Sequence, residues 1–158
     1  MFIILIVIFL FFLFFNRCTT SFRTKSGRRF KARNLKTAEL IDVLRDISIH
    51  LSYNINKKLG EKLRSRLQNT SFKEIINGNP NILAWNYNKG REIGVRIYDN
   101  KGIKYSNSHI IKALFHELAH SLDDKRGHGY TWERTDEYLQ YYAPKYVKIL
   151  NLKTKIIV

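Results

Sequence analysis

The chain is poor in cysteine, which stabilises many small secreted domains, and in acidic residues, which would balance its many lysines and arginines. Cys18 is its single cysteine, so no disulfide can form within the chain, which agrees with a reducing compartment. Acidic residues are also scarce, because 13 Asp and Glu oppose 28 Lys and Arg and the formal net charge is +15. Charge of this sign suits an anionic partner such as a nucleic acid or a lipid surface.

The start of the chain has no charge at all. Residues 2–15 contain no polar side chain, and no lysine or arginine precedes Asn16. This run predicts a transmembrane helix over residues 1–16, although its length of about 21 Å is short for a bilayer. A cleaved signal peptide is less favoured because it needs a basic start and a small-residue cleavage site, and residues 18–21 make a poor one.

The following segment is strongly basic. Residues 17–36 hold eight lysines and arginines, and no acidic residue occurs before Glu39. We interpret this segment as a juxtamembrane linker, and the positive-inside rule then predicts a single-pass membrane protein with its main domain on the cytoplasmic side. Because a membrane surface already accounts for these basic residues, a nucleic acid is possible as a partner but is not favoured. The Ile-, Lys- and Asn-rich composition also suggests an AT-rich genome, such as that of a virus.

Residues 37–158 are long enough for one domain with its own core. An apolar stripe at helical spacing predicts a long helix from Thr37 that breaks near residues 54–60. Apolar runs between turns predict short strands, followed by a helix that opens at residues 135–137 and ends before Pro144. The predicted fold is α+β, with helices around a small antiparallel sheet. The predicted strands are residues 82–87, 93–98 and 103–105.

The strongest chemical signal is the sequence His-Glu-Leu-Ala-His at residues 116–120. Ser106 and its neighbours can cap a helix here, and the apolar residues that follow recur at helical spacing. Within a helix, His116 and His120 lie on one face about one turn apart and can bind the same cation. Glu117 lies one step around the helix, where it can act as a general base on water activated by the metal.

A catalytic zinc ion usually has three protein ligands and one open position. His128 is the best candidate for the third ligand, because Gly127 and Gly129 on either side would let the chain turn sharply back onto the helix. Glu133, Asp136 or Glu137 are alternative ligands, ranked second because acidic residues often serve the positive end of a helix. His109 lies about 10 Å along the helix from His116, which suggests a cap rather than a ligand.

Residues 116–120, followed by His128-Gly129-x-x-Trp132, resemble the SprT-like and WLM zinc metallopeptidases over roughly residues 80–142. The resemblance implies a zincin-like fold, Zn²⁺ ligands at His116, His120 and His128, and Glu117 as the catalytic base. It also implies a protein or peptide substrate, and Trp132 packed behind the third ligand. The chain departs from many SprT relatives, because it lacks the cysteines of a zinc ribbon.

Two functions therefore remain open at this point. The favoured one is a membrane-anchored zinc metallopeptidase that hydrolyses peptide bonds with Glu117 as general base. The alternative is a non-enzymatic, basic, membrane-anchored domain that binds lipid, nucleic acid or a protein partner and holds at most a structural zinc. The sequence does not indicate an oligomeric state.

Overall fold

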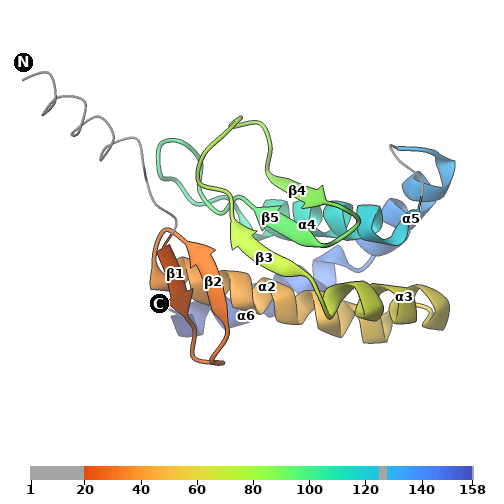
Figure 1. The fold of residues 1–158 in the computed structure, drawn as a ribbon, viewed down its shortest axis with the longest axis horizontal. Coiled ribbons are helices and arrows are strands. Elements are labelled where there is room, and N and C mark those ends of the chain that lie inside the picture. Colours follow the sequence, from red (N-terminus) through yellow and green to blue (C-terminus); the bar gives the residue numbers. More distant parts are fainter. Residues whose placement is uncertain (1–19, 125–127, 158) are drawn as a thin grey trace, which may run out of the picture.

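The computed structural model describes residues 20–124 and 128–157, which form an α+β fold with a five-stranded sheet (Figure 1). The strands are short and follow the order β1-β2-β3-β5-β4 across the sheet. Their bounds are β1 Thr20–Arg23, β2 Arg29–Ala32, β3 Ser71–Glu74, β4 Ala84–Tyr87 and β5 Glu92–Val95. The helices are α2 Leu35–Asn54, α3 Lys57–Leu67, α4 Asn107–Leu122, α5 Tyr130–Gln140 and α6 Ala143–Ile157.

The sheet is mixed, so the prediction of a purely antiparallel sheet is wrong. β1 with β2 and β4 with β5 form antiparallel pairs, whereas β3 lies parallel to both β2 and β5. Parallel neighbours need a long crossover connection, and α2 and α3 provide one between β2 and β3. The predicted third strand, at residues 103–105, is only an isolated bridge between Tyr98 and Lys104.

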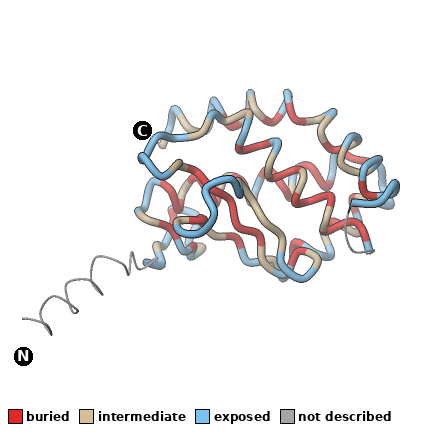
Figure 2. The backbone as a smooth tube through the Cα atoms, turned by 90° about the horizontal axis from the view of Figure 1, so that it is seen from above, coloured by how far each residue is buried: buried red, intermediate tan, exposed pale blue. Residues whose placement is uncertain are grey.

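The helices pack on one face of the sheet. Residues alternate between buried and exposed along β2, where Phe30 and Ala32 are buried and Arg29 and Lys31 are exposed. This alternation is typical of a sheet with one covered face. α2 packs against β2 and β3, while α4 packs against β4 and β5 (Figure 1). Figure 2 shows buried and exposed residues alternating along the helices. The core between these layers therefore holds α4 firmly beside the edge strand β4.

The predicted break in the long helix is confirmed between α2 and α3. Asn56 caps α3 by accepting a hydrogen bond from Leu59 N at 3.0 Å. Gly60 follows where the two helices approach closely, since a Cβ atom there would lie 2.2 Å from the carbonyl oxygen of Ser52. Glycine is thus required at this position for steric reasons.

The basic segment at residues 20–32 forms part of the sheet as the β1–β2 hairpin. The buried carboxylate of Asp42 on α2 accepts hydrogen bonds from Thr24 Oγ1 at 2.6 Å and Ser26 Oγ at 2.5 Å, and it pairs with Arg28. These contacts attach the hairpin to α2. The predicted juxtamembrane linker, residues 17–36, thus includes two strands of the sheet, in which the buried Phe30 and Ala32 alternate with exposed basic residues.

The localisation predicted from the sequence needs correction. No helix within residues 20–124 and 128–157 combines the length and the apolar character needed to cross a membrane. α2 has 20 residues, but it carries charged side chains, including Glu39, Asp42 and Arg45. The predicted transmembrane helix, residues 1–16, lies outside the described residues. The described structure does not support a single-pass membrane protein.

Candidate metal centre

α4 positions two of the predicted metal ligands. The helix begins after Ser106, whose Oγ accepts a hydrogen bond from His109 N at 3.2 Å. Leu114, Phe115 and Leu118 bury one face of the helix in the core. His116 and His120 are half-buried at the border of that face, one turn apart. Packing in the core therefore fixes the two imidazoles on the same side of the helix.

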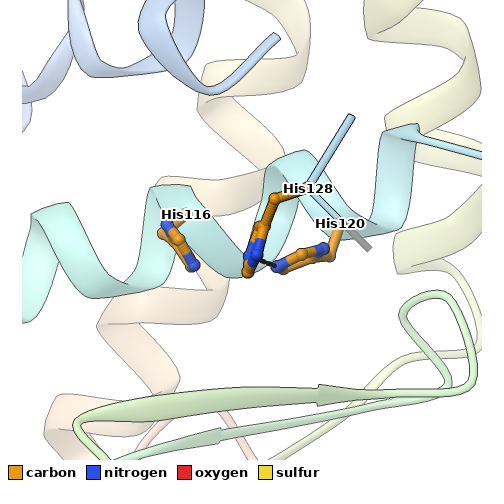
Figure 3. Close-up of side chains that lie close together, drawn as sticks. All are labelled: His116, His120 and His128. Carbon is orange, nitrogen blue, oxygen red and sulfur yellow. Dashed lines mark hydrogen bonds between the residues drawn. The ribbon is translucent and has the colours of Figure 1, made fainter. Parts of the chain in front are cut away.

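His128 approaches the same point from the segment that follows α4. A nitrogen from each of His116, His120 and His128 lies within 4.8 Å of the others (Figure 3). The Nε2 atoms of His120 and His128 are 3.1 Å apart. Two ligand nitrogens on one tetrahedral ion, each at 2.0–2.1 Å, are separated by about 3.4 Å. The three histidines can thus bind one metal ion after a small adjustment of the rings.

Of the two glycines predicted to let the chain turn at His128, only Gly129 is among the described residues. Gly127 lies outside the described residues. Gly129 is the N-cap of α5 and has φ −87° and ψ 170°, an extended backbone that other residues adopt readily. A Cβ atom on Gly129 would have no neighbour within 4 Å. The position of His128 therefore does not depend on a left-handed conformation at Gly129.

Trp132 packs against all three imidazoles. Its ring centroid is 4.8 Å from that of His116, 4.9 Å from that of His120 and 4.2 Å from that of His128. The indole is stacked on His120, with an angle of 26° between the ring planes, and Trp132 is buried. It limits the rotation of the rings and shields one side of the site from water.

Asp136 supports the site without joining the group of ligand atoms. Its Oδ2 lies 3.6 Å from Nδ1 of His116, and its Oδ1 accepts a hydrogen bond from Gln140 Nε2 at 3.1 Å. Gln140 also donates to the carbonyl oxygen of Lys112 on α4 at 3.0 Å. A carboxylate beside the far nitrogen of a metal-binding imidazole fixes its tautomer and orientation. Glu133 and Glu137, the other two alternative ligands, are exposed and lie outside the three-histidine group.

Glu117 lies next to the ligand cluster on a buried part of α4. Burial, followed by the charge of Asp136, raises the pKa of its carboxyl to about 7. A carboxyl with a pKa near neutrality can both take up and release a proton at physiological pH. Burial, followed by the charges of His116 and His128, lowers the pKa of His120 to about 4. His120 is therefore neutral at pH 7, the form in which imidazole binds metals.

A groove runs along the open side of the cluster. Its larger hollow, of about 1150 Å³, is bordered by His116 and Glu117, and its smaller one, of about 780 Å³, by Glu117 and His120. Ala84, at the start of β4, lines both hollows. The groove therefore follows the edge strand, with Glu117 where the two hollows meet. This leaves the ligand cluster accessible from one side.

Asn86 on β4 holds the edge strand against α4. Its Nδ2 donates to the carbonyl oxygen of Glu117 at 2.6 Å and to Ser121 Oγ at 2.7 Å, while its Oδ1 accepts from Gly90 N at 2.7 Å. Sequence reasoning missed both this role and that of Asp136. The spacing of Trp132, Asp136 and Gln140 four residues apart could have revealed their shared helix face, if α5 had been predicted to begin at Tyr130.

The remaining histidines, His50 and His109, lie away from the cluster, as predicted for His109. His109 is in the first turn of α4 and its Nδ1 lies 2.7 Å from Ser106 Oγ. His50 on α2 hydrogen-bonds the buried hydroxyl of Tyr146 at 3.0 Å, which ties α2 to α6. Both have structural roles in the described part of the chain.

The geometry thus shows a group of three histidines that can bind a metal ion, beside a buried glutamate and an accessible groove. Comparisons of the chain with protein-family models, with curated proteins and with solved structures found no match.

Proposed function

We propose that this protein is a zinc-dependent metallopeptidase. The observation that supports this most is the meeting of three imidazoles from two segments beside Glu117, with one side of the cluster open to a groove. Structural zinc sites usually have four protein ligands and are closed, whereas catalytic sites have three and keep one position open. An open three-histidine site favours catalysis over a purely structural role.

The donor set is compatible with zinc. Imidazole nitrogens suit zinc, copper, iron and nickel, and His116, His120 and His128 supply three of them without a thiolate. When bound, zinc would lower the pKa of water and polarise a substrate carbonyl. Asp136 would hold the proton of His116 on Nδ1, which leaves Nε2 available to a metal ion, and Trp132 would limit the movement of all three rings.

Glu117 is the proposed general base. It takes the proton from the water that attacks the peptide carbonyl, and it then gives the proton to the leaving amine nitrogen. In the metal-free protein, burial raises the pKa of its carboxyl, which makes Glu117 a better proton acceptor than an exposed glutamate. Its place where the two hollows meet lets a chain that lies in the groove pass directly over its carboxylate.

The proposed substrate is an extended protein or peptide segment. β4 is at the edge of the sheet and pairs only with β5 among the described strands. Such an edge offers backbone donors and acceptors to a further strand, which is a common mode of peptide binding. Asn86 fixes this edge relative to the backbone of Glu117, so a paired substrate would lie at a constant distance from the base.

The test compares purified wild-type protein with Glu117→Gln, using zinc content and hydrolysis of an unstructured protein as the two readouts. We expect equal zinc in both proteins, and a loss of activity of at least about 100-fold in Glu117→Gln. Glu133→Gln makes the same chemical change on the exposed surface of α5 and should keep full activity. Stoichiometric zinc with no hydrolysis by the wild-type protein would instead support a structural metal site.

A further inference from the structure

The larger hollow of the groove has apolar walls and is wide enough for a substrate side chain. It lies between the loop before β4, the first three turns of α4 and the start of α6. Ala113 comes from α4, and Ala143 and Val147 come from α6. His116 and Glu117 border the same hollow, so a group bound there lies close to the proposed site of hydrolysis.

Basic residues outnumber acidic ones around this hollow. Lys112, Lys148 and His109 contribute to its lining, and Glu117 is its single acidic residue among the described ones. Lys112 and Lys148 are exposed, and neither forms an ion pair with another residue in the described part of the chain. The first turns of α4 and α6 also contain no acidic residue. Two ammonium groups are thus available to an anionic ligand.

The smaller hollow differs in this respect. Its lining includes one lysine, Lys89, and the Nζ of that residue donates a hydrogen bond to the carbonyl oxygen of Asp123 at 2.7 Å. Its other walls include Trp85, Tyr87 and Ala84, which carry no charge. The two ends of the groove therefore differ, because two exposed lysines line the larger hollow, whereas the single lysine that lines the smaller hollow is bound to a backbone carbonyl.

We infer that the larger hollow binds a carboxylate of the substrate, held by Lys112 and Lys148 above the apolar walls. This inference rests on the proposed function, because it assigns a specificity pocket to the same active site. The methylene groups of a glutamate side chain would contact Ala113, Ala143 and Val147, and its carboxylate would reach the ammonium groups. A free C-terminal carboxylate has the same chemistry and is the second source to test.

The test measures the binding of short neutral peptides by fluorescence anisotropy, in zinc-loaded full-length Glu117→Gln protein so that no turnover occurs. The peptides share one sequence and carry Glu, Gln or Lys at a single scanned position, each with a free or an amidated C-terminus. Exposed ion pairs are weak individually, so with two lysines we expect the best Glu peptide to bind about fivefold more tightly than its Gln counterpart. Kinetic comparison of the same peptides with the wild-type protein should give a similar ratio of kcat/KM.

The lysines are tested by Lys112→Glu combined with Lys148→Glu, which should abolish the Glu preference and favour the Lys peptide. Lys101→Glu with Lys155→Glu is the matched control, because both residues are exposed and outside the hollow while the change in net charge is the same. If the charge-reversed protein does not fold, Lys112→Gln with Lys148→Gln replaces it and should remove the preference without reversing it.

Equal binding of the Glu, Gln and Lys peptides, or a preference unchanged by the Lys112 and Lys148 variants, would overturn the inference. A preference that disappears on amidation would assign the carboxylate to the C-terminus, and one that survives amidation would assign it to a side chain. The proposed function has a separate outcome. If wild-type protein binds zinc but hydrolyses none of the peptides, peptidase activity is contradicted while the binding data still decide the charge preference.

Discussion

Asp136 Oδ2 lies 3.6 Å from Nδ1 of His116, and this pair connects α5 to the metal-binding face of α4. With Nε2 of His116 as the ligand atom, the contact places a carboxylate on the other imidazole nitrogen. Gln140 holds the other oxygen of Asp136 in place, and its amide also contacts the backbone of α4. The orientation of His116 therefore depends on a second helix as well as on its own.

Replacing Asp136 with Asn should weaken zinc binding about 10- to 100-fold, because loss of a charged partner behind a metal-binding histidine typically has this effect. Competition with a chromophoric chelator measures the affinity. Glu137→Gln, at the exposed neighbouring position, is the control and should leave the affinity unchanged. An unchanged affinity in Asp136→Asn would show that Asp136 does not orient His116.

Asn86→Ala should destabilise the fold by about 1–3 kcal/mol, because the change leaves partners of three short hydrogen bonds unsatisfied near the groove. Urea unfolding of the metal-free protein measures the free energy. Gln68→Ala removes an exposed polar side chain of similar size and should cost less than about 0.5 kcal/mol. If the two variants lose the same small amount, Asn86 does not anchor β4 to α4.

Substitution by alanine should destabilise the protein at Gly60 but not at Gly129. Gly60→Ala brings a Cβ atom within 2.2 Å of Ser52 O, so α2 and α3 must separate, at a cost of about 1–3 kcal/mol or more. Gly129→Ala meets open space and an ordinary extended backbone, so we expect little change in stability and full zinc binding. Thermal unfolding and metal analysis test both variants. Loss of zinc in Gly129→Ala would mean that the approach of His128 does need a glycine.

The stability of the metal-free protein should depend on the charge state of Glu117. Its pKa is about 7 in the folded protein and 4.5 when unperturbed. Because the folded state binds the proton more tightly, this residue favours folding most at low pH, and its contribution is lost as the pH rises from about 4.5 to 7. Each unit of pKa difference corresponds to about 1.4 kcal/mol, so the total is a few kcal/mol.

The effect of Glu117 is isolated by comparing wild type with Glu117→Gln across this pH range. The lowered pKa of His120 gives the opposite trend, because its contribution to stability is lost as the pH falls through 6.5 towards 4. This effect of His120 is present in both proteins, so it cancels in the comparison. We expect wild type to lose stability relative to Glu117→Gln between pH 4.5 and 7. A constant difference over that range would show that the carboxyl of Glu117 titrates normally.

Local features of the site could be predicted from the sequence. The cap at Ser106, the apolar face of α4 and the spacing of His116 and His120 all depend on residues within one helix. The break before α3 is local as well, because Asn56 caps the helix that begins one residue later. Features that depend on residues within a few helical turns of one another could therefore be predicted from the residue types alone.

Contacts between distant segments were harder to predict. The parallel pairing of β3 with β2 depends on how α2 and α3 cross the sheet, and no short pattern encodes that path. Asn86 acts on Glu117, which lies 31 residues further along the chain. The hairpin at residues 20–32 was missed because Asp42, its main anchor, lies on a different element.

Zinc titration of the full-length wild-type protein beside His128→Ala tests the central claim most directly. The predicted result is one tightly bound zinc ion per wild-type chain and an affinity at least about 100-fold lower in His128→Ala, because one of three ligand nitrogens is lost. Full zinc occupancy with unchanged affinity in His128→Ala would contradict the claim that these three histidines form the metal centre.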